Sequence, residues 1–342
     1  MEKEVDKSFA LVRPPGHHAH RVVYGDRGFC IINIEAVALE RIRQEYGNLR
    51  VAIVDTDCHH GDGTEDIYWN DKDTLFLSFH QDGRTLYPGT GHMDDFGGPS
   101  AYGYNINIPL PPQTGEEGFL YVLDNVILPI LDDYKPDIII NSAGQDNHYS
   151  DPLTSMNFTA QGYAILNDRL NPDIAVLEGG YSIEGALPYM NLGIILAMAG
   201  LDYSHVKEPD YNREKLRQSN DITEYIKQLS DVIYRRWQKK DDMQREKFKG
   251  LEYVTRSRQI YYDTDEIMEN QNEKFKICNK CSGLNTIVSK SDTGYRILAI
   301  IIPRDGCANC IDEGYALYKN SKSGGFYKVY LQDRVQDVFR SY

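Results

Sequence analysis

The chain has 342 residues, of which 41% are hydrophobic and 26% charged, and its formal net charge is -14. This length suits one large domain with a smaller one, and the acidic balance argues against a general binder of phosphate backbones. There is no apolar run of about 18 residues, and the charged N-terminus lacks the apolar region of a signal peptide, so we expect a cytoplasmic protein without a membrane span.

Short apolar runs rich in Ile and Val alternate with helical patterns over the first 200 residues or so. Strands are predicted at 50–56, 74–79, 137–142 and 174–178, and helices at 31–46, 115–133, 158–169 and 183–199. This alternation predicts an α/β fold with a mainly parallel sheet and helices on both faces. Ligands of such sheets bind at the carboxyl ends of the strands.

The remaining third of the chain has a different composition. A helix is predicted at 221–240, where apolar residues recur at helical spacing, and we expect it to pack on the main domain. The strongly charged stretch that follows is interpreted as a linker or exposed helix, and a small β-rich module is expected after it. The predicted division is therefore 1–240, 241–274 and 275–342.

The stretch DTDCHHGDG, residues 55–63, directly follows the apolar run VAIV. Alternate residues of a strand point the same way, so Asp55, Asp57 and His59 would share one face. Carboxylate with imidazole suits Zn²⁺ or Fe²⁺, and the alternative is a solvated acidic turn before the next helix. Asp146, in SAGQDNHYSDPL just past another predicted strand, could be a third ligand and leave one position open for water.

Two further motifs carry groups suited to catalysis. RPPGHHAH puts His17 and His18 on a stiff turn, where they could act as general base and acid if Asp55 and Asp62 partner them. LEGGY follows a strand and could present Tyr181 as a hydrogen-bond donor to a developing oxyanion. The alternatives are surface histidines in a loop and a plain Gly-Gly turn with a packed tyrosine.

Together these segments resemble the histone deacetylase superfamily of acetylpolyamine amidohydrolases, acetoin-utilisation-type proteins and eukaryotic lysine deacetylases. The matching signatures are RPPGHHA, GFCIIN, DTDCHHGDGTEDIYW, LFLSFH, YPGTG, SAGQDNHYSDPL and LEGGY, in family order over roughly residues 10–200. RPPGHHA and LEGGY resemble the class II-like and prokaryotic branches more closely, whereas HHGDG, with Asp62 in place of Asn, resembles the form of class I and many prokaryotic members. The resemblance implies an arginase-like α/β fold. It also implies a hydrolase that removes an acetyl or other short acyl group from a lysine side chain or related amine, using water activated by a metal ion.

The resemblance also implies roles for individual residues. A catalytic zinc ion, with Fe²⁺ as the alternative metal, would be bound by Asp57, His59 and Asp146. His17 would pair with Asp55 and His18 with Asp62, one of these histidines would take a proton from the attacking water, and Tyr181 would donate to the oxyanion. A potassium ion is expected at Asp55, Asp57, His59, Ser78 and Phe79. The substrate tunnel is expected at Gly28, Phe29, Tyr87 and Leu153.

Three departures from the family pattern are visible. About 12 residues precede RPPGHHA, where the family has a much longer segment that helps to wall the pocket, so we expect a truncated gene model, a fragment or a reduced variant. Gln145 and Asn147 replace the commoner neighbours of the metal-binding aspartate. Leu153 stands where a polyamine-selective eukaryotic member has a glutamate, which favours an acetylated lysine peptide or protein over an acetylated amine. The competing functions are an acetylpolyamine or other small-molecule deacetylase and an inactive scaffold.

Four cysteines near the C-terminus follow the pattern C-x2-C-x25-C-x2-C: Cys278, Cys281, Cys307 and Cys310. Two such knuckles around a predicted hairpin at YRILAIIIP are typical of a zinc ribbon, and four thiolates would close the shell of a second, structural zinc ion. The alternative is four free thiols. A module this small has little core, so the metal would supply much of its stability. Zinc ribbons often contact nucleic acid or protein.

Overall fold

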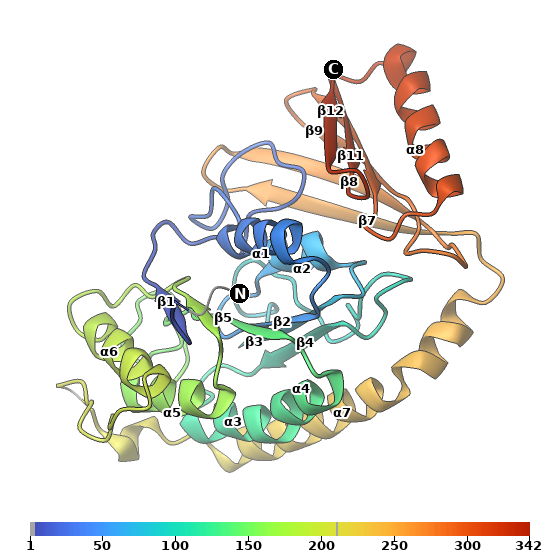
Figure 1. Cartoon of the computed structure of the whole chain (residues 1–342). Coiled ribbons are helices and arrows are strands. Elements are labelled where there is room, and N and C mark those ends of the chain that lie inside the picture. The colour runs from blue at the N-terminus through green and yellow to red at the C-terminus, as the bar shows by residue number, and fades with distance from the viewer. Residues whose placement is uncertain (1–3, 210) are drawn as a thin grey trace.

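The computed structural model describes residues 4–209 and 211–342, so that residues 1–3 and 210 of the predicted first domain lie outside the described part. A six-stranded sheet with the order β1-β6-β5-β2-β3-β4 forms the larger body (Figure 1). Its strands are β1 (Ser8–Ala10), β2 (Val51–Asp55), β3 (Thr74–Gln81), β4 (Asn105–Leu110), β5 (Ile138–Ser142) and β6 (Ile174–Val176). Every neighbouring pair is parallel, which confirms the predicted sheet.

Helices cover both faces of this sheet, as predicted. One face carries α1 (Ile34–Tyr46) and α2 (Asp62–Tyr68). The other carries α3 (Glu116–Val122), a π-helical segment η1 (Leu123–Ile127), α4 (Leu128–Tyr134), α5 (Ala160–Leu170), α6 (Leu187–Met198) and α7 (Asn220–Phe248), with the short η2 (Arg213–Leu216) before α7. Alternate residues of β2 face the two layers, because Ile53 packs with α1 and α2 while Val54 belongs to the larger core beneath α3–α7.

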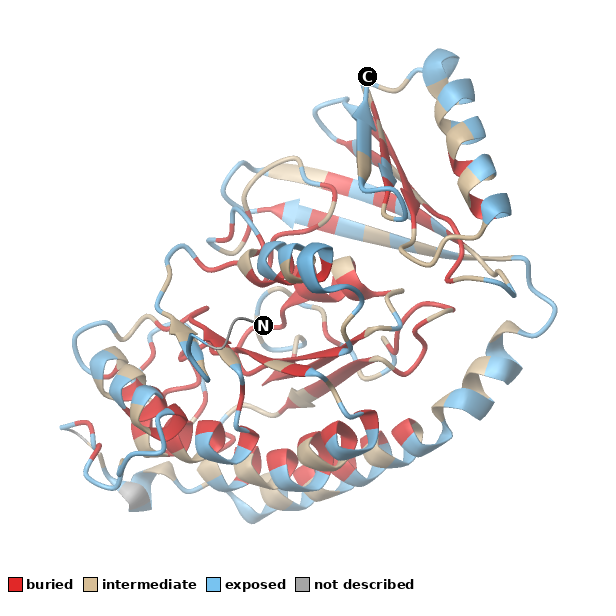
Figure 2. Cartoon of the chain, viewed as in Figure 1, coloured by how far each residue is buried: buried red, intermediate tan, exposed pale blue. Residues whose placement is uncertain are grey.

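The predicted elements of this body are all present, with ends that shift by a few residues. Side chains outside the helices explain several starts: Asn33 accepts a hydrogen bond from the N–H of Ala36 in α1, and Thr159 accepts one from Gly162 in α5. The strands β1 and β4 and the helix α2 were not among the predicted elements. Figure 2 shows the buried strands of the sheet between the inner faces of the two helical layers.

Helix α7 lies against the main domain, as predicted for 221–240, and continues to Phe248. Its buried side chains include Ile226, Ile233 and Trp237, which join the core of the parallel sheet. Trp237 is 2% exposed and its indole N–H donates to Asp133 of α4 at 2.8 Å. The helix is therefore part of the first domain.

We expect Trp237→Ala to lower the free energy of unfolding by about 3–5 kcal/mol, because it opens a large cavity in this core. Urea unfolding followed by circular dichroism measures the change. Arg235→Ala, an exposed position on the same helix, is the matched control. A loss for Trp237→Ala no greater than that of the control would contradict the packing described for α7.

The C-terminal part forms a second six-stranded sheet with the order β12-β11-β10-β9-β8-β7. Its strands are β7 (Tyr253–Tyr262), β8 (Ile267–Lys276), β9 (Asn285–Ser291), β10 (Arg296–Ile302), β11 (Lys328–Asp333) and β12 (Val338–Ser341). Only the pair β10–β11 is parallel among the described strands of this sheet. A hairpin does lie between the two cysteine pairs, but it is β9–β10, and the predicted stretch YRILAIIIP supplies only β10. The helix α8 (Ala308–Asn320), followed by η3 (Ser321–Ser323), was not expected.

The interpretation of 241–274 as a linker or exposed helix holds for 241–248, the largely exposed end of α7, but is wrong from Tyr253 onward. This stretch contains the end of α7, all of β7 and most of β8, so the second sheet begins at Tyr253. The strand β7 reads YVTRSRQIYY and was taken for an exposed charged segment. Its Arg256 and Arg258 instead pair with Glu65 and Asp66 of α2, which lie in the first domain.

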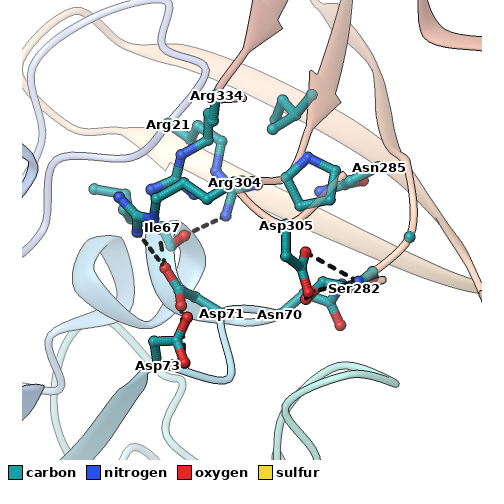
Figure 3. A pocket seen from close by; sticks show the side chains of 13 residues that line it. Arg21, Ile67, Asn70, Asp71, Asp73, Ser282, Asn285, Arg304, Asp305 and Arg334 are labelled. Atoms are coloured by element: carbon teal, nitrogen blue, oxygen red, sulfur yellow. Dashed lines mark hydrogen bonds and ion pairs between the residues drawn. The ribbon is translucent and has the colours of Figure 1, made fainter. Parts of the chain in front are cut away.

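Ion pairs join the two domains along a seam. Arg304 lies 2.7 Å from both Glu40 and Asp71, and Arg334 lies 2.6 Å from Glu40. Figure 3 shows these arginines around a small pocket in the seam, where Asp71 of the first domain already partners them. In the part of the chain that the structure describes, no helix combines the length and apolar character needed to cross a membrane.

Candidate active site

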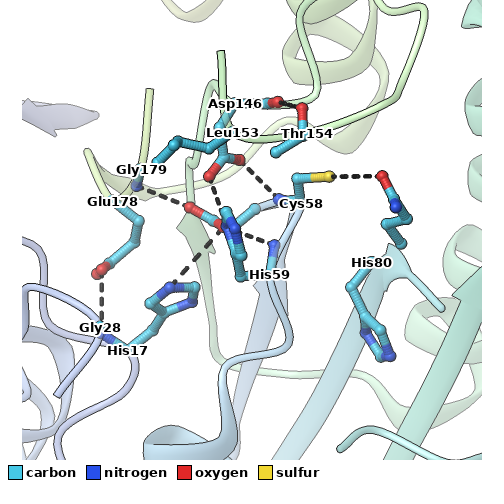
Figure 4. A network of polar contacts seen from close by, with 12 residues as sticks. His17, Gly28, Cys58, His59, His80, Asp146, Leu153, Thr154, Glu178 and Gly179 are labelled. Carbon is cyan, nitrogen blue, oxygen red and sulfur yellow. Dashed lines mark hydrogen bonds and ion pairs between the residues drawn. The ribbon is translucent and has the colours of Figure 1, made fainter. Parts of the chain in front are cut away.

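Three potential metal ligands meet at the carboxyl edge of the parallel sheet. The strands β2 and β5 are in register, with Asp55 opposite Ser142, so the loops that follow them begin side by side. Ligand atoms of Asp57, His59 and Asp146 lie within 4.8 Å of one another, and all three residues are buried. His59 Nδ1 is 2.8 Å from Asp146 and 3.2 Å from Asp57 (Figure 4). The structure thus brings together the three residues that the sequence singled out.

Backbone donors orient the two carboxylates. Asp57 accepts from the N–H of Gly179 at 2.7 Å, and Asp146 accepts from the N–H of Cys58 at 2.7 Å. A Cβ at Gly179 would collide with both carboxylates, so the first glycine of LEGGY permits this close approach. Any other residue at this position would place its Cβ against the two carboxylates.

The electrostatics of this cluster favour a bound cation. Burial raises the pKa of Asp146 to about 7, and the negative charge of Asp57 adds to the effect. Burial would also raise the pKa of Asp57, but the positive charges of His17 and His59 lower it well below its usual range. Two buried carboxylates beside an imidazole are the donor set that a divalent zinc or iron ion accepts, and such an ion would balance their charge.

Two histidine–carboxylate pairs lie beside the cluster. His17 Nδ1 is 3.1 Å from Asp55 and His18 Nδ1 is 2.7 Å from Asp62, and the two imidazole rings are 4.1 Å apart. Burial lowers the pKa of His18 to about 3, and the charge of His17 adds to the shift. Burial would lower the pKa of His17 as well, but Asp57 and Asp55 outweigh it and raise that pKa well above its usual value. The adjacent rings therefore have different protonation preferences.

Aromatic side chains stand between the histidines and the surface. The Tyr87 ring lies 5.3 Å from that of His18, and the Tyr181 ring lies 6.5 Å from that of His59 and 5.7 Å from that of Phe29. Phe29 is 61% exposed, as is usual for the mouth of a site. Burial raises the pKa of Tyr181, so its hydroxyl keeps its proton.

The other residues expected at the tunnel and at the potassium site lie in the same region. Leu153 is 45% exposed and follows the loop of Asp146, and a Cβ at Gly28 would overlap the His18 ring. Ser78 of β3 is in register with Asp55, and its Oγ lies 2.9 Å from His80 Nδ1. Phe79 is fully buried, with its ring against that of Phe119.

Several groups at the site were not singled out from the sequence. The buried Glu178 carboxylate accepts from the N–H groups of Gly16 at 2.6 Å and His17 at 3.0 Å, and Arg13 donates to the carbonyl of Glu178. These contacts fix the histidine turn to the LEGGY segment. The sequence did offer a signal for both residues. Arg13 stands in RPPGHHAH and Glu178 in LEGGY, and a charged residue inside a buried motif needs a partner.

Asp62 also has partners beyond His18. His20 Nε2 lies 3.3 Å from it and the guanidinium of Arg27 lies 2.8 Å from it. Asp151 accepts from the N–H of Tyr181 at 2.8 Å, which holds that tyrosine segment in place. His20 closes the motif RPPGHHAH, but its role depends on a fold that brings residue 62 back to it.

The four C-terminal cysteines also converge. Cys278 Sγ is 3.8 Å from Cys307 Sγ, and Cys281 Sγ is 3.5 Å from Cys310 Sγ. All four sulfur atoms lie within 4.8 Å of one another. Cys278 and Cys281 follow β8, and the other pair opens α8. A hydrogen bond from the Cys310 backbone N–H lowers the pKa of Cys307 to about 7, which favours its thiolate, whereas burial raises the pKa of Cys281 and of Cys310.

Comparisons with known proteins identify the first domain. The family model described as "Histone deacetylase domain" matches residues 1–191. A "Probable deacetylase" of Archaeoglobus fulgidus is 49% identical over 219 residues, which cover 61% of this chain and 60% of that protein. The chain thus spans about 60% of the length of that relative.

Solved structures that resemble the chain include two whose names give a related domain or activity. The HDA15 HD domain superposes with a TM-score of 0.59 at 30% identity, covering 72% of this chain and 66% of that one. An acetylpolyamine aminohydrolase from Burkholderia pseudomallei superposes with a TM-score of 0.54 at 34% identity, covering 58% of each chain. The archaeal and bacterial relatives agree with the predicted prokaryotic branch. The second sheet and the four cysteines beside it lie outside residues 1–191, the part that the family model matches.

Proposed function

Because this chain belongs to the histone deacetylase family, we propose that it is a zinc-dependent hydrolase that removes an acetyl or other short acyl group from a lysine side chain or related amine. The observation that supports this best is the meeting of Asp57, His59 and Asp146 beside two histidine–carboxylate pairs. Such a set of three ligands leaves a coordination position open, as hydrolytic metal sites do.

Asp57, His59 and Asp146 would hold the metal, with Fe²⁺ as the alternative to zinc. An ion bound there would polarise the acyl carbonyl and lower the pKa of a water molecule. We further propose a potassium ion at the group expected from the sequence: Asp55, Asp57, His59, Ser78 and Phe79. All of these residues are buried at the ends of β2 and β3, where a second cation would offset the remaining negative charge.

The histidine pairs would move the protons of the reaction. Carboxylates hold Nδ1 of both rings, so Nε2 of each is the nitrogen left for proton transfer. One of His17 and His18 would take a proton from the attacking water, and a protonated histidine would pass one to the leaving nitrogen. Water adds to the carbonyl carbon, the C–N bond breaks, and the products are a short carboxylic acid and a free amine.

The remaining residues of the site would bind the substrate chain and stabilise the oxyanion that forms during the reaction. Tyr181 would donate its hydroxyl proton in a hydrogen bond to the oxygen that becomes negative when water adds. Phe29, Tyr87 and Leu153 would line the path of an aliphatic chain, because all three are partly exposed, the Tyr87 ring lies against that of His18 and the Phe29 ring lies against that of Tyr181. Gly28 would leave room for that chain beside the His18 ring.

Acetate release from two substrates in parallel tests this function and separates the substrate classes. The zinc-loaded protein is given an acetyl-lysine peptide in one assay and an acetylpolyamine in the other. Release from at least one, lost on chelation and regained with zinc, is the expected result, and the faster substrate names the class. No release from either by protein with zinc at the main site would favour an inactive binding protein.

We also propose that Cys278, Cys281, Cys307 and Cys310 bind a structural zinc ion, and that the chain divides into domains after α7 and before β7. Four sulfur ligands would close the coordination shell, so no reaction is assigned there. The few buried apolar residues beside the cysteines include Leu284, Ile302 and Val329, so the metal would add much to the stability of this part.

Cys278→Ser should remove about one zinc ion per chain and lower the denaturant midpoint for loss of the second sheet, because a hydroxyl is a poor replacement for a thiolate ligand. Metal analysis by mass spectrometry and denaturant unfolding measure the two effects. Lys280→Ser, an exposed change in the same knuckle, is the control. Equal zinc content in the two variants would rule out the site.

A further inference from the structure

The hairpin β7–β8 spans the distance between the cysteine cluster and the candidate active site. Its strands pair along their full length, from Tyr253 opposite Lys276 to Tyr262 opposite Ile267. The open end of the hairpin leads into Cys278, while the turn 263–266 reaches the loop formed by residues 25–30 (Figure 1). A segment of the second domain therefore touches a loop of the first domain that carries tunnel residues.

The turn binds this loop through two carboxylates. Asp263 accepts from the N–H of Gly28, with its two oxygens 3.1 and 3.2 Å from the nitrogen, and Asp265 accepts from the N–H of Asp26 at 2.7 Å. These are charge-assisted hydrogen bonds to the backbone, which are stronger than neutral ones. Both bonds are made to the backbone of the loop, at Asp26 and at Gly28.

The loop needs such support because its backbone is strained. Gly28 has φ +54° and Phe29 has φ +64°, so two successive residues adopt the left-handed region and the second of them carries a bulky side chain. A phenylalanine in that region is strained and persists only where its surroundings hold it. Asp263 binds the N–H of Gly28, the residue directly before Phe29.

The shape of the loop matters for the site that it borders. The Gly28 backbone abuts the His18 ring, and the Cys30 thiol donates to the Gly28 carbonyl at 3.4 Å. Arg27 in the same loop pairs with Asp62 at 2.8 Å, and its guanidinium lies 5.5 Å from the centre of the Tyr87 ring. A change in the loop would therefore move both the aromatic wall and the partner of a candidate catalytic histidine.

The hairpin itself is fixed to the first domain. Arg256 lies 2.8 Å from Glu65 and 3.6 Å above the centre of the Trp69 ring, and Arg258 pairs with Asp66. These contacts occur on α2, which begins directly after the DTDCHHG segment. The position of the turn relative to the site is thus set by ion pairs between partly buried arginines of the strand and buried carboxylates of α2.

We propose that the C-terminal domain completes the active site, with Asp263 as a positioning residue that holds the Gly28–Phe29 turn in the form that receives the acylated chain. This role rests on the proposed deacylase function. The domain that holds the cysteine cluster would then contribute to substrate binding through the hairpin. Asp263 lies outside the part of the chain that the family model matches.

Three variants test the proposal: Asp263→Ala, Asp263→Asn and Glu266→Gln. The first removes the acceptor for the Gly28 N–H, and the second keeps an acceptor oxygen. The third removes an equal charge from an exposed position in the same turn. We expect Asp263→Ala to raise KM by about tenfold while kcat changes by less than about threefold, which matches the loss of one charge-assisted hydrogen bond in binding. Asp263→Asn should stay within about threefold of the unmodified protein, and Glu266→Gln should match it.

Hydrogen exchange measured by mass spectrometry gives a second readout that needs no activity. Peptides covering residues 25–30 should exchange faster in Asp263→Ala than in Glu266→Gln, while peptides from β2 and β5 should not change. If Asp263→Ala matches Glu266→Gln in both KM and exchange, the positioning role is excluded. If the unmodified protein releases no acetate but the exchange difference is found, the deacylase function fails while the contact between hairpin and loop stands.

Discussion

Asp146→Ala should abolish acetate release, with a fall in kcat/KM of at least about 10³-fold and the loss of one bound metal ion per chain. The substitution leaves only Asp57 and His59 of the three ligands that meet at the sheet edge. It also removes the acceptor of the Cys58 N–H, so the loop that carries Asp57 loses part of its support. Metal analysis and an acetate assay on the same sample measure both effects.

Asp132→Ala is the control for this variant, because Asp132 is an exposed aspartate on α4. It should keep the metal content and the activity of the unmodified protein. Full activity in Asp146→Ala would remove Asp146 from the reaction. Loss of activity with unchanged metal content would assign it a role other than metal binding.

Tyr181→Phe should lower kcat by about 10²–10³-fold while metal content and folding stay unchanged. The hydroxyl of Tyr181 is the proposed donor to the oxyanion, and burial keeps it protonated. Its ring is 6.5 Å from that of His59, close to the candidate metal ligands. Steady-state kinetics on the faster of the two substrates measures the effect.

The same hydroxyl deletion at Tyr327, which is 61% exposed in the second domain, is the control and should have no effect on kcat. A rise in KM alone for Tyr181→Phe would make Tyr181 a binding residue. An unchanged kcat and KM would leave the oxyanion without the proposed donor.

The first sheet and the metal group could be anticipated because both depend on local patterns. The run VAIV is apolar on both faces of β2, and the polar residues start where the strand ends. Parallel strands end at one edge, so Asp57 and Asp146 had to lie near each other once both strands were recognised. The pairing of His17 with Asp55 was given by the family resemblance, and the contact is present.

The strands β7 and β8 could not be recognised from composition. The sequence of β7, YVTRSRQIYY, contains several charged and polar residues, and such a composition is typical of a solvated segment. The charges of Arg256 and Arg258 are compensated by Glu65 and Asp66, which come from a helix almost 200 residues earlier. Only the three-dimensional arrangement reveals that these side chains are partnered.

The helix α8 was missed for a different reason. Because two cysteine pairs flank a predicted hairpin, a β-rich module without a helix was expected here. The residues Ile311, Tyr315 and Tyr318 nevertheless recur at helical spacing after Cys307, and all three pack on the small core beside the cysteines. That periodicity was the available signal.

The most direct test of the account is recovery of acetate release as zinc is added back to chelated protein, with Asp146→Ala treated in parallel. The account predicts that the unmodified protein regains activity in proportion to zinc bound at a site that Asp146→Ala lacks. Acetate release by the metal-free protein, or zinc bound at that site without any release from either substrate, would contradict it.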